Sequence, residues 1–238
     1  MLKHIDSKKM GRSQHGWLDS HFHFSFAEYY NPQNIQFGVL RVVNDDIIQP
    51  GAGFDTHPHS NMEIISYIVD GSLTHADSIG NQHTLTRGQV QYMSAGTGIS
   101  HSEYNLGKEW ARLLQIWILP DQGGYPPAYG NFPFKFDDRK NKWMPIASGV
   151  NNSTSSAPVR LHQDINMAAT LLEKGSLLDF SVEKGRQAYL VLIEGEANIN
   201  GIELKMRDAL EIVEEDITIH AMENAHILVI EMAKPTKS

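Results

Sequence analysis

The stretch GAGFDTHPHSNMEIISYIVDG at residues 51–71 carries two histidines two positions apart, His57 and His59, ahead of a run rich in Ile, Val and Tyr. In a β-strand, residues i and i+2 project from the same face of the sheet. The stretch therefore predicts a strand that delivers two imidazole side chains to one side. A single pair of this kind is also compatible with ordinary polar residues on an edge strand, which Pro58 would mark.

A second stretch favours a metal site. QYMSAGTGISHSEYN at 91–105 places His101 and Glu103 at the same spacing, after two glycines, Gly96 and Gly98, that allow a sharp turn. If the two strands lie close together inside a barrel, three imidazoles and one carboxylate converge on one point. Such a set suits a first-row divalent ion, and four protein ligands on an octahedral ion leave about two positions open for chemistry.

Both stretches resemble the two sequence motifs of the cupin superfamily and, within it, the pirin family. HPH-x3-E-x3-YIVDG at 57–71 and the stretch at 91–105 carry the resemblance, and HFSFAEYYNP at 23–32 and FGVLRVVNDD at 37–46 also look like pirin sequence. The resemblance covers most of residues 20–120. It implies an all-β protein with two cupin, jelly-roll-type β-barrel domains packed together and a few short helices. The chain looks most like bacterial members that act as quercetin 2,3-dioxygenases.

The sequence departs from the general cupin pattern at two places. Seven residues separate Glu63 from Gly71, where the common first motif has six. In the second motif Ser94 replaces a proline, and the gap between Gly96 and His101 is longer. These departures put the first-motif glutamate, Glu63, in doubt as a metal ligand.

The resemblance implies a different carboxylate ligand. In the pirin family it is the glutamate two residues after the second-motif histidine, which here is Glu103, and strand parity agrees because Glu103 shares a face with His101. We therefore expect His57, His59, His101 and Glu103 to bind one divalent transition metal ion. Glu63 is expected to support the ligands without touching the ion, or to have a structural role, and it remains the alternative ligand.

Iron is our first choice of metal, and nickel, cobalt, copper, manganese and zinc remain open because these ligands suit all of them. The resemblance implies a metal-dependent dioxygenase of the quercetin 2,3-dioxygenase type, which cleaves a flavonol-like phenolic substrate with dioxygen. Glu103 is then also the expected catalytic base, since an ion-bound carboxylate beside an open position can accept the enol proton. Phe37, Tyr92 and Met93 are candidates to line the cavity, although the sequence does not decide which way they face.

Two other functions stay open. A pirin-like, metal-dependent redox sensor or regulatory binding protein would act on a protein partner without turnover. An isomerase or hydrolase using zinc is the third option, because a fold does not fix a function.

The composition excludes several mechanisms. The 238 residues include 12 histidines and no cysteine, and 20 basic against 28 acidic residues give a formal net charge of −8. Without cysteine there is no disulfide, zinc ribbon, iron–sulfur cluster or thiol nucleophile, so a metal must bind nitrogen and oxygen. The acidic balance argues against direct nucleic-acid binding, which needs clustered Lys and Arg. A polar N-terminus without a long apolar stretch predicts a cytoplasmic protein with no membrane segment.

Short runs rich in Val, Ile, Tyr and Phe recur along the chain and predict strands. The Ser- and Asn-rich segment at 148–158 predicts a connection between an N-terminal metal-binding domain, 1–148, and a degenerate C-terminal domain, 149–238. A faint internal repeat supports two related barrels. Ile165 to Lys174 is the best helical candidate.

The other histidines are expected outside the site. His21 and His23 alternate with phenylalanines in a predicted half-buried strand, and His75 and His83 flank a predicted hairpin turn, where we expect them to be solvated. The C-terminal half has no HxH pair, so we expect no metal there and assign it the role of covering the first barrel.

Overall fold

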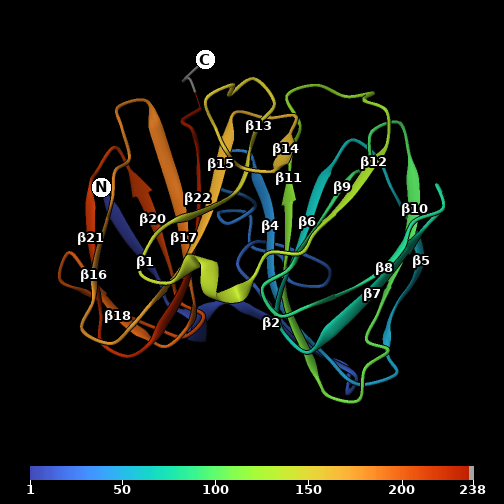
Figure 1. Cartoon of the computed structure of the whole chain (residues 1–238), viewed down its shortest axis with the longest axis horizontal. Coiled ribbons are helices and arrows are strands. Elements are labelled where there is room, and N and C mark those ends of the chain that lie inside the picture. Colours follow the sequence, from blue (N-terminus) through green and yellow to red (C-terminus); the bar gives the residue numbers. More distant parts are fainter. Residues whose placement is uncertain (236–238) are drawn as a thin grey trace. The chain divides into compact units, whose positions relative to one another are not determined.

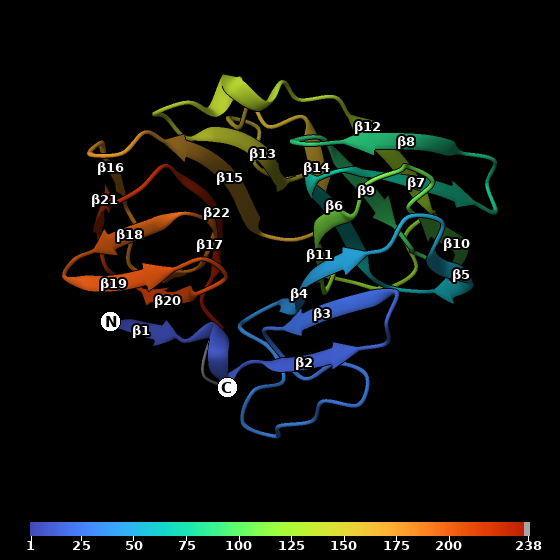
Figure 2. The same ribbon diagram turned by 90° about the horizontal axis from the view of Figure 1, so that it is seen from below.

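Short apolar strands build the described part of the chain, residues 1–235, into four β-sheets in the computed structural model (Figure 1; Figure 2). The chain divides into two units. The N-terminal unit is residues 11–136, and the C-terminal unit is residues 1–10 together with the chain from Asp137 onward. Each unit holds one seven-stranded and one four-stranded sheet. No helix of residues 1–235 is long and apolar enough to cross a membrane.

The N-terminal unit consists of two antiparallel sheets. In spatial order, its large sheet contains β12 (Ala128–Phe132), β9 (Val90–Ser94), β6 (Glu63–Asp70), β11 (Ala111–Ile118), β4 (Leu40–Ile48), β3 (Leu18–Phe22) and β2 (Gly11–Gln14). Its small sheet contains β5 (Gly53–His59), β10 (Ile99–Tyr104), β7 (Ser72–Asp77) and β8 (Gln82–Thr86). The two predicted ligand pairs therefore lie on neighbouring strands of one sheet.

The C-terminal unit repeats this arrangement. Its large sheet contains β1 (Leu2–Ile5), β20 (Ala209–Val213), β17 (Arg186–Glu194), β22 (Ala225–Ala233), β15 (Ile165–Leu172), β13 (Met144–Gly149) and β14 (Val159–Leu161). Its small sheet contains β16 (Leu177–Phe180), β21 (Ile217–Ala221), β18 (Glu196–Ile199) and β19 (Ile202–Lys205). Two 3-10 helices, η1 (Ser7–Lys9) and η2 (Phe136–Arg139), are the helical segments of residues 1–235.

Apolar side chains from both sheets hold the N-terminal unit together. One buried cluster joins Ile68 of β6 and Leu113 of β11 to Leu73 of β7 and Leu85 of β8. A second cluster packs Ile99 of β10 against β6 and β9. Because each fully buried side chain of this size contributes about 1.5–3 kcal/mol, the two clusters fix the small sheet over the large one.

The all-β prediction with two cupin-type domains is confirmed, with one correction to the architecture. The sheets form open two-sheet sandwiches rather than closed barrels, because each sheet has two edge strands that pair on one side only. The helix predicted from Ile165 to Lys174 is wrong, since residues 165–172 form β15. Its side chains alternate in burial, and β15 pairs with both β13 and β22, so sheet pairing overrides the helical propensity of its Met, Ala and Leu residues.

The structure divides the chain differently from the predicted boundary after residue 148. That boundary falls inside β13, and the Ser- and Asn-rich segment connects β13 to β14, which pair in parallel within the C-terminal unit. The first residues also belong to this unit, because β1 pairs antiparallel with β20, where Leu2 lies opposite Ile212. The partner of a strand can lie about 200 residues away in the sequence, as Ile212 does from Leu2, so local composition cannot predict the pairing.

Candidate metal centre

Strand pairing brings the predicted ligand pairs together. β10 lies between β5 and β7, and its register places His101 opposite His57 on one side and opposite Asp77 on the other. The β5–β10 pairing shifts register between His101 and Glu103. The extra residue lies on β5, between Phe54 and His57, whereas β10 pairs with β7 without a shift, so His101 and Glu103 keep the alternation that puts them on one face.

The three histidines His57, His59 and His101 form a tight cluster. Their ring centroids lie 4.8 Å apart for His57 and His59, 4.6 Å for His57 and His101, and 5.0 Å for His59 and His101. One ring nitrogen from each lies within 4.8 Å of the other two, a spacing that could hold a metal ion. His101 is buried, whereas His57 and His59 are partly exposed.

The protonation of the cluster suits a metal. Burial and the neighbouring histidines lower the pKa of His59 to about 4 and that of His101 to about 3, so both rings are neutral near pH 7. Metal binding requires neutral imidazole. His57 Nδ1 lies 2.6 Å from the carbonyl oxygen of Asp55, and an N–H donated there leaves the Nε2 lone pair available. His101 Nε2 is buried without a hydrogen-bond partner within residues 1–235, an orphan that an ion would satisfy.

Glu103 lies beside this cluster and is held by three neutral donors. The Ser66 hydroxyl and the Gln91 amide donate to its Oε1 at 2.8 Å each, and the Gln115 amide donates to its Oε2 at 2.7 Å. Its oxygens are not part of the three-histidine group; they form a second group of possible ligands with His101 and His75. Sequence reasoning missed the three donors, although each is a single polar residue inside an apolar strand run, a pattern that marks a buried polar contact.

Glu63 occupies a different hydrogen-bond network. Its carboxylate accepts from the Tyr92 hydroxyl at 2.7 Å and from the Ser94 hydroxyl at 2.6 Å. Burial, together with the Glu63 charge, raises the pKa of Tyr92, so this tyrosine stays protonated and donates. Glu63 belongs to neither group of possible metal ligands among the described residues.

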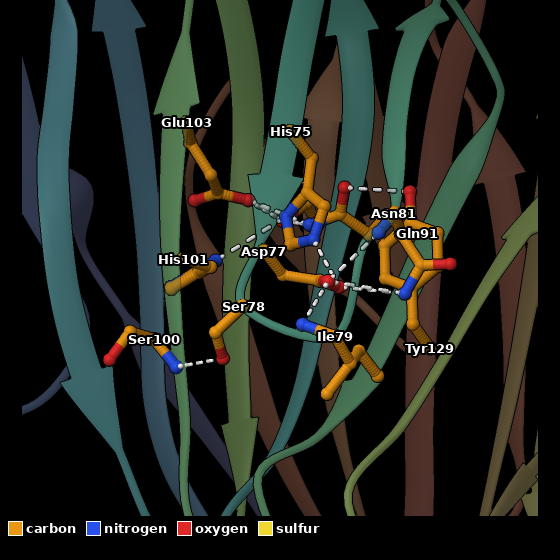
Figure 3. Close-up of polar contacts among 11 residues, drawn as sticks. His75, Asp77, Ser78, Ile79, Asn81, Gln91, Ser100, His101, Glu103 and Tyr129 are labelled. Carbon is orange, nitrogen blue, oxygen red and sulfur yellow. Dashed lines mark hydrogen bonds and ion pairs between the residues drawn. The ribbon is translucent and has the colours of Figure 1, made fainter.

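The prediction for His75 is wrong. This residue is fully buried rather than solvated, because β7 pairs with β10 and turns the His75 ring toward His101 (Figure 3). Its neighbour across the hairpin, His83, is exposed as predicted. His21 and His23 belong to neither group of possible ligands in residues 1–235.

A cavity of about 420 Å³ opens at the histidines. Four aromatic side chains line it, namely Trp17, Phe26, Phe54 and Trp117, and the polar lining comprises Asn44, Asp46, Asp55, His57, His59, His101, Glu103 and Gln115. The Trp117 ring lies edge-on to His59 at 4.8 Å and to Phe26 at 5.4 Å. None of the three candidates Phe37, Tyr92 and Met93 is in this lining. A volume of this size, with aromatic walls and a few polar groups, suits a small aromatic ligand.

Asp46 adds a titratable group to the cavity wall. Burial raises its pKa to about 7; the hydrogen bond donated by Ser20 opposes the rise, and the charges of Asp45 and Glu103 add to it. Asp46 therefore exchanges its proton near neutral pH.

This fold and this site define a two-domain cupin protein with a candidate metal centre in its N-terminal unit. The family model described as Pirin matches residues 5–118, and the one described as Quercetinase C-terminal cupin domain matches residues 146–232. The chain belongs to the pirin family.

Named relatives and solved structures agree with this membership. The chain is 44% identical over 233 residues to a pirin-like protein of Caulobacter vibrioides, covering 96% of this chain and 100% of the relative. It is 37% identical over 228 residues to quercetin 2,3-dioxygenase of Escherichia coli K12, covering 95% and 96%. The crystal structure of the bacterial pirin YhhW from Escherichia coli in complex with nickel(II) matches with a TM-score of 0.91 and 36% identity, covering 99% of this chain and 100% of that one.

Proposed function

We propose that His57, His59, His101 and Glu103 hold one divalent transition metal ion, with iron as the first choice, and that the N-terminal unit is a dioxygenase for flavonol-like phenolics. The observation that carries the proposal is the convergence of three imidazoles on the wall of an aromatic cavity, one of them with a buried Nε2 that has no hydrogen-bond partner in the described part of the chain. The quercetin 2,3-dioxygenase name of the Escherichia coli relative supports the reaction, and the nickel complex of YhhW supports a metal.

An ion held by His57, His59, His101 and Glu103 would supply the Lewis-acid and redox chemistry that the reaction of a phenolic substrate with dioxygen needs. The four aromatic side chains of the cavity offer flat apolar surfaces to a phenolic ring and exclude water from it. Ser66, Gln91 and Gln115 orient the Glu103 carboxylate by donating to both of its oxygens. A carboxylate has about four lone-pair sites, so these three donors leave Glu103 one site for the ion, and acceptance of the enol proton would require one of the donors to leave its oxygen.

The test uses metal-depleted protein reloaded with Fe²⁺ or Ni²⁺ and incubated with quercetin in oxygenated buffer. We expect loss of the visible absorbance of quercetin, with oxygen uptake and release of carbon monoxide. His57→Ala should abolish turnover and lower the metal content, whereas His83→Ala, at an exposed histidine of the same sheet, should retain both. The proposal fails if the loaded parent protein leaves quercetin intact or if His57→Ala turns it over at the parent rate.

A further inference from the structure

His75 is a buried titratable residue that the proposed ligand set leaves unused. It belongs to β7, whose register places it opposite Glu103 and places Asp77 opposite His101. The His75 side chain is fully buried, and the Tyr129 ring stacks on it at a centroid distance of 4.5 Å and an interplanar angle of 16°. Figure 3 shows the contacts of this ring with His101 and with Asp77.

Each ring nitrogen of His75 has one polar partner. Its Nε2 lies 3.1 Å from Oδ2 of Asp77, and its Nδ1 lies 3.4 Å from Nδ1 of His101. The three side chains therefore form one chain of hydrogen bonds, which begins at a carboxylate and ends at a predicted metal ligand. The far end of this chain is His101 Nε2, the buried nitrogen that has no hydrogen-bond partner among residues 1–235.

The direction of these hydrogen bonds follows from Asp77. Its carboxylate accepts from the backbone N–H groups of Ile79 and Asn81 at 3.0 Å each and from the Asn81 side-chain amide at 2.9 Å. Burial alone would raise the pKa of Asp77, but the bonds from Asn81, His75 and Ile79 hold it below its ordinary value. An ionised carboxylate can only accept, so His75 Nε2 carries the hydrogen that is donated to it.

The tautomer of His101 follows in turn. In a neutral ring with hydrogen on Nε2, His75 Nδ1 has a lone pair and accepts the N–H of His101 Nδ1. A neutral His101 with hydrogen on Nδ1 has its remaining lone pair on Nε2, the nitrogen left without a partner. The hairpin turn that binds Asp77 thus determines which nitrogen of His101 is available to an ion.

We propose that His75, held by Asp77, is a positioning residue that sets the tautomer and ring orientation of His101 and so presents His101 Nε2 to the metal. The proposal rests on the proposed metal centre but not on phenol turnover. Partners that orient a metal-binding histidine typically contribute about 10–100-fold to metal affinity. The competing arrangement is that His75, His101 and Glu103 themselves hold an ion, since their ligand atoms also lie within 4.8 Å of one another.

Three variants of the full chain test the role of His75. His75→Phe keeps an aromatic ring against Tyr129 and removes both nitrogens, whereas His75→Asn supplies an amide oxygen that can accept from His101. His83→Phe is the matched control, because His83 is exposed and stacks on Tyr129 at 5.6 Å. Ni²⁺ affinity is measured by chelator competition, Ni²⁺ stoichiometry by metal analysis, and folding by circular dichroism.

We expect His75→Phe to bind Ni²⁺ about 10–100-fold more weakly, His75→Asn to recover most of the loss, and His83→Phe to match the parent. Equal losses in His75→Phe and His83→Phe, or no loss in His75→Phe, would overturn the role. Two Ni²⁺ ions per parent chain, with one lost in His75→Phe, would establish the competing arrangement instead.

A measurement on the parent protein does not depend on whether a variant folds. Long-range ¹H–¹⁵N NMR of the Zn²⁺-bound protein should show hydrogen on Nδ1 of His101 and on Nε2 of His75, and the opposite tautomer of either ring overturns the inference. A parent that binds no metal refutes the proposed centre and this role with it. A parent that binds metal and shows these tautomers but leaves phenols intact contradicts the proposed activity alone.

Discussion

Asp46 should make the metal-free protein less stable as the pH rises toward neutrality. Burial raises its pKa from 3.8 to about 7. Between these values the unfolded chain has lost the proton that the folded chain keeps, so the contribution of Asp46 to stability falls with rising pH. At about 1.36 kcal/mol per pH unit, the full loss is about 4 kcal/mol, of which roughly 3 kcal/mol falls between pH 5 and pH 8. Below pH 3.8 both states are protonated and the loss vanishes.

The Asp46→Asn variant isolates this effect, because an amide keeps an acceptor for Ser20 and does not ionise. Urea unfolding followed by tryptophan fluorescence reports mainly on the N-terminal unit, which contains Trp17, Trp110 and Trp117. Relative to the parent, Asp46→Asn should gain roughly 3 kcal/mol on going from pH 5 to pH 8, whereas Asp70→Asn, at an exposed end of β6, should follow the parent. Parallel pH profiles for the parent and Asp46→Asn would refute the reasoning.

Three further substitutions test the contacts that support the metal centre and the strands around it. Arg112→Met should destabilise the protein by about 3–5 kcal/mol in urea unfolding, because it leaves the buried Asp45 carboxylate without the arginine that binds both of its oxygens. Gly53→Ala should lower Ni²⁺ affinity, since a Cβ there would lie 2.2 Å from the backbone oxygen of Glu103 and push β5 away from β10. Gln115→Leu removes a donor to Glu103 and should weaken Ni²⁺ binding by about 10–100-fold in chelator competition while the fold is retained.

Matched control variants separate these effects from a non-specific loss of stability. Arg12→Met breaks an exposed ion pair and should change stability little. Gly123→Ala meets only a side-chain amide at 3.1 Å, and Gln82→Leu changes an exposed glutamine of β8, so both should bind Ni²⁺ like the parent. If a control variant loses as much stability or Ni²⁺ affinity as the substitution it is matched to, the assigned contact is not responsible for the effect.

The sequence predicted what strand parity determines locally. His57 and His59 lie together because alternation along one strand is a local property. The burial of His75 could not be predicted in this way, since it depends on the pairing of β7 with β10. That pairing brings His75 against His101, which lies 26 positions further along the chain. A hairpin turn beside a histidine indicates exposure only when no other strand covers that face.

The departures of this chain from the general cupin motif have a physical explanation. A proline at position 94 would have no side-chain donor, whereas the Ser94 hydroxyl, with that of Tyr92, binds both oxygens of Glu63. A carboxylate held on both oxygens by β9 would have to break these bonds to reach the histidines. Glu103 is also bound on both oxygens, but its donors leave it next to His101, within the spacing of a possible metal ligand. The network around Glu63 therefore supports Glu103 as the proposed carboxylate ligand. It also predicts that Ser94→Ala, which removes one donor to Glu63, changes metal affinity less than Gln115→Leu.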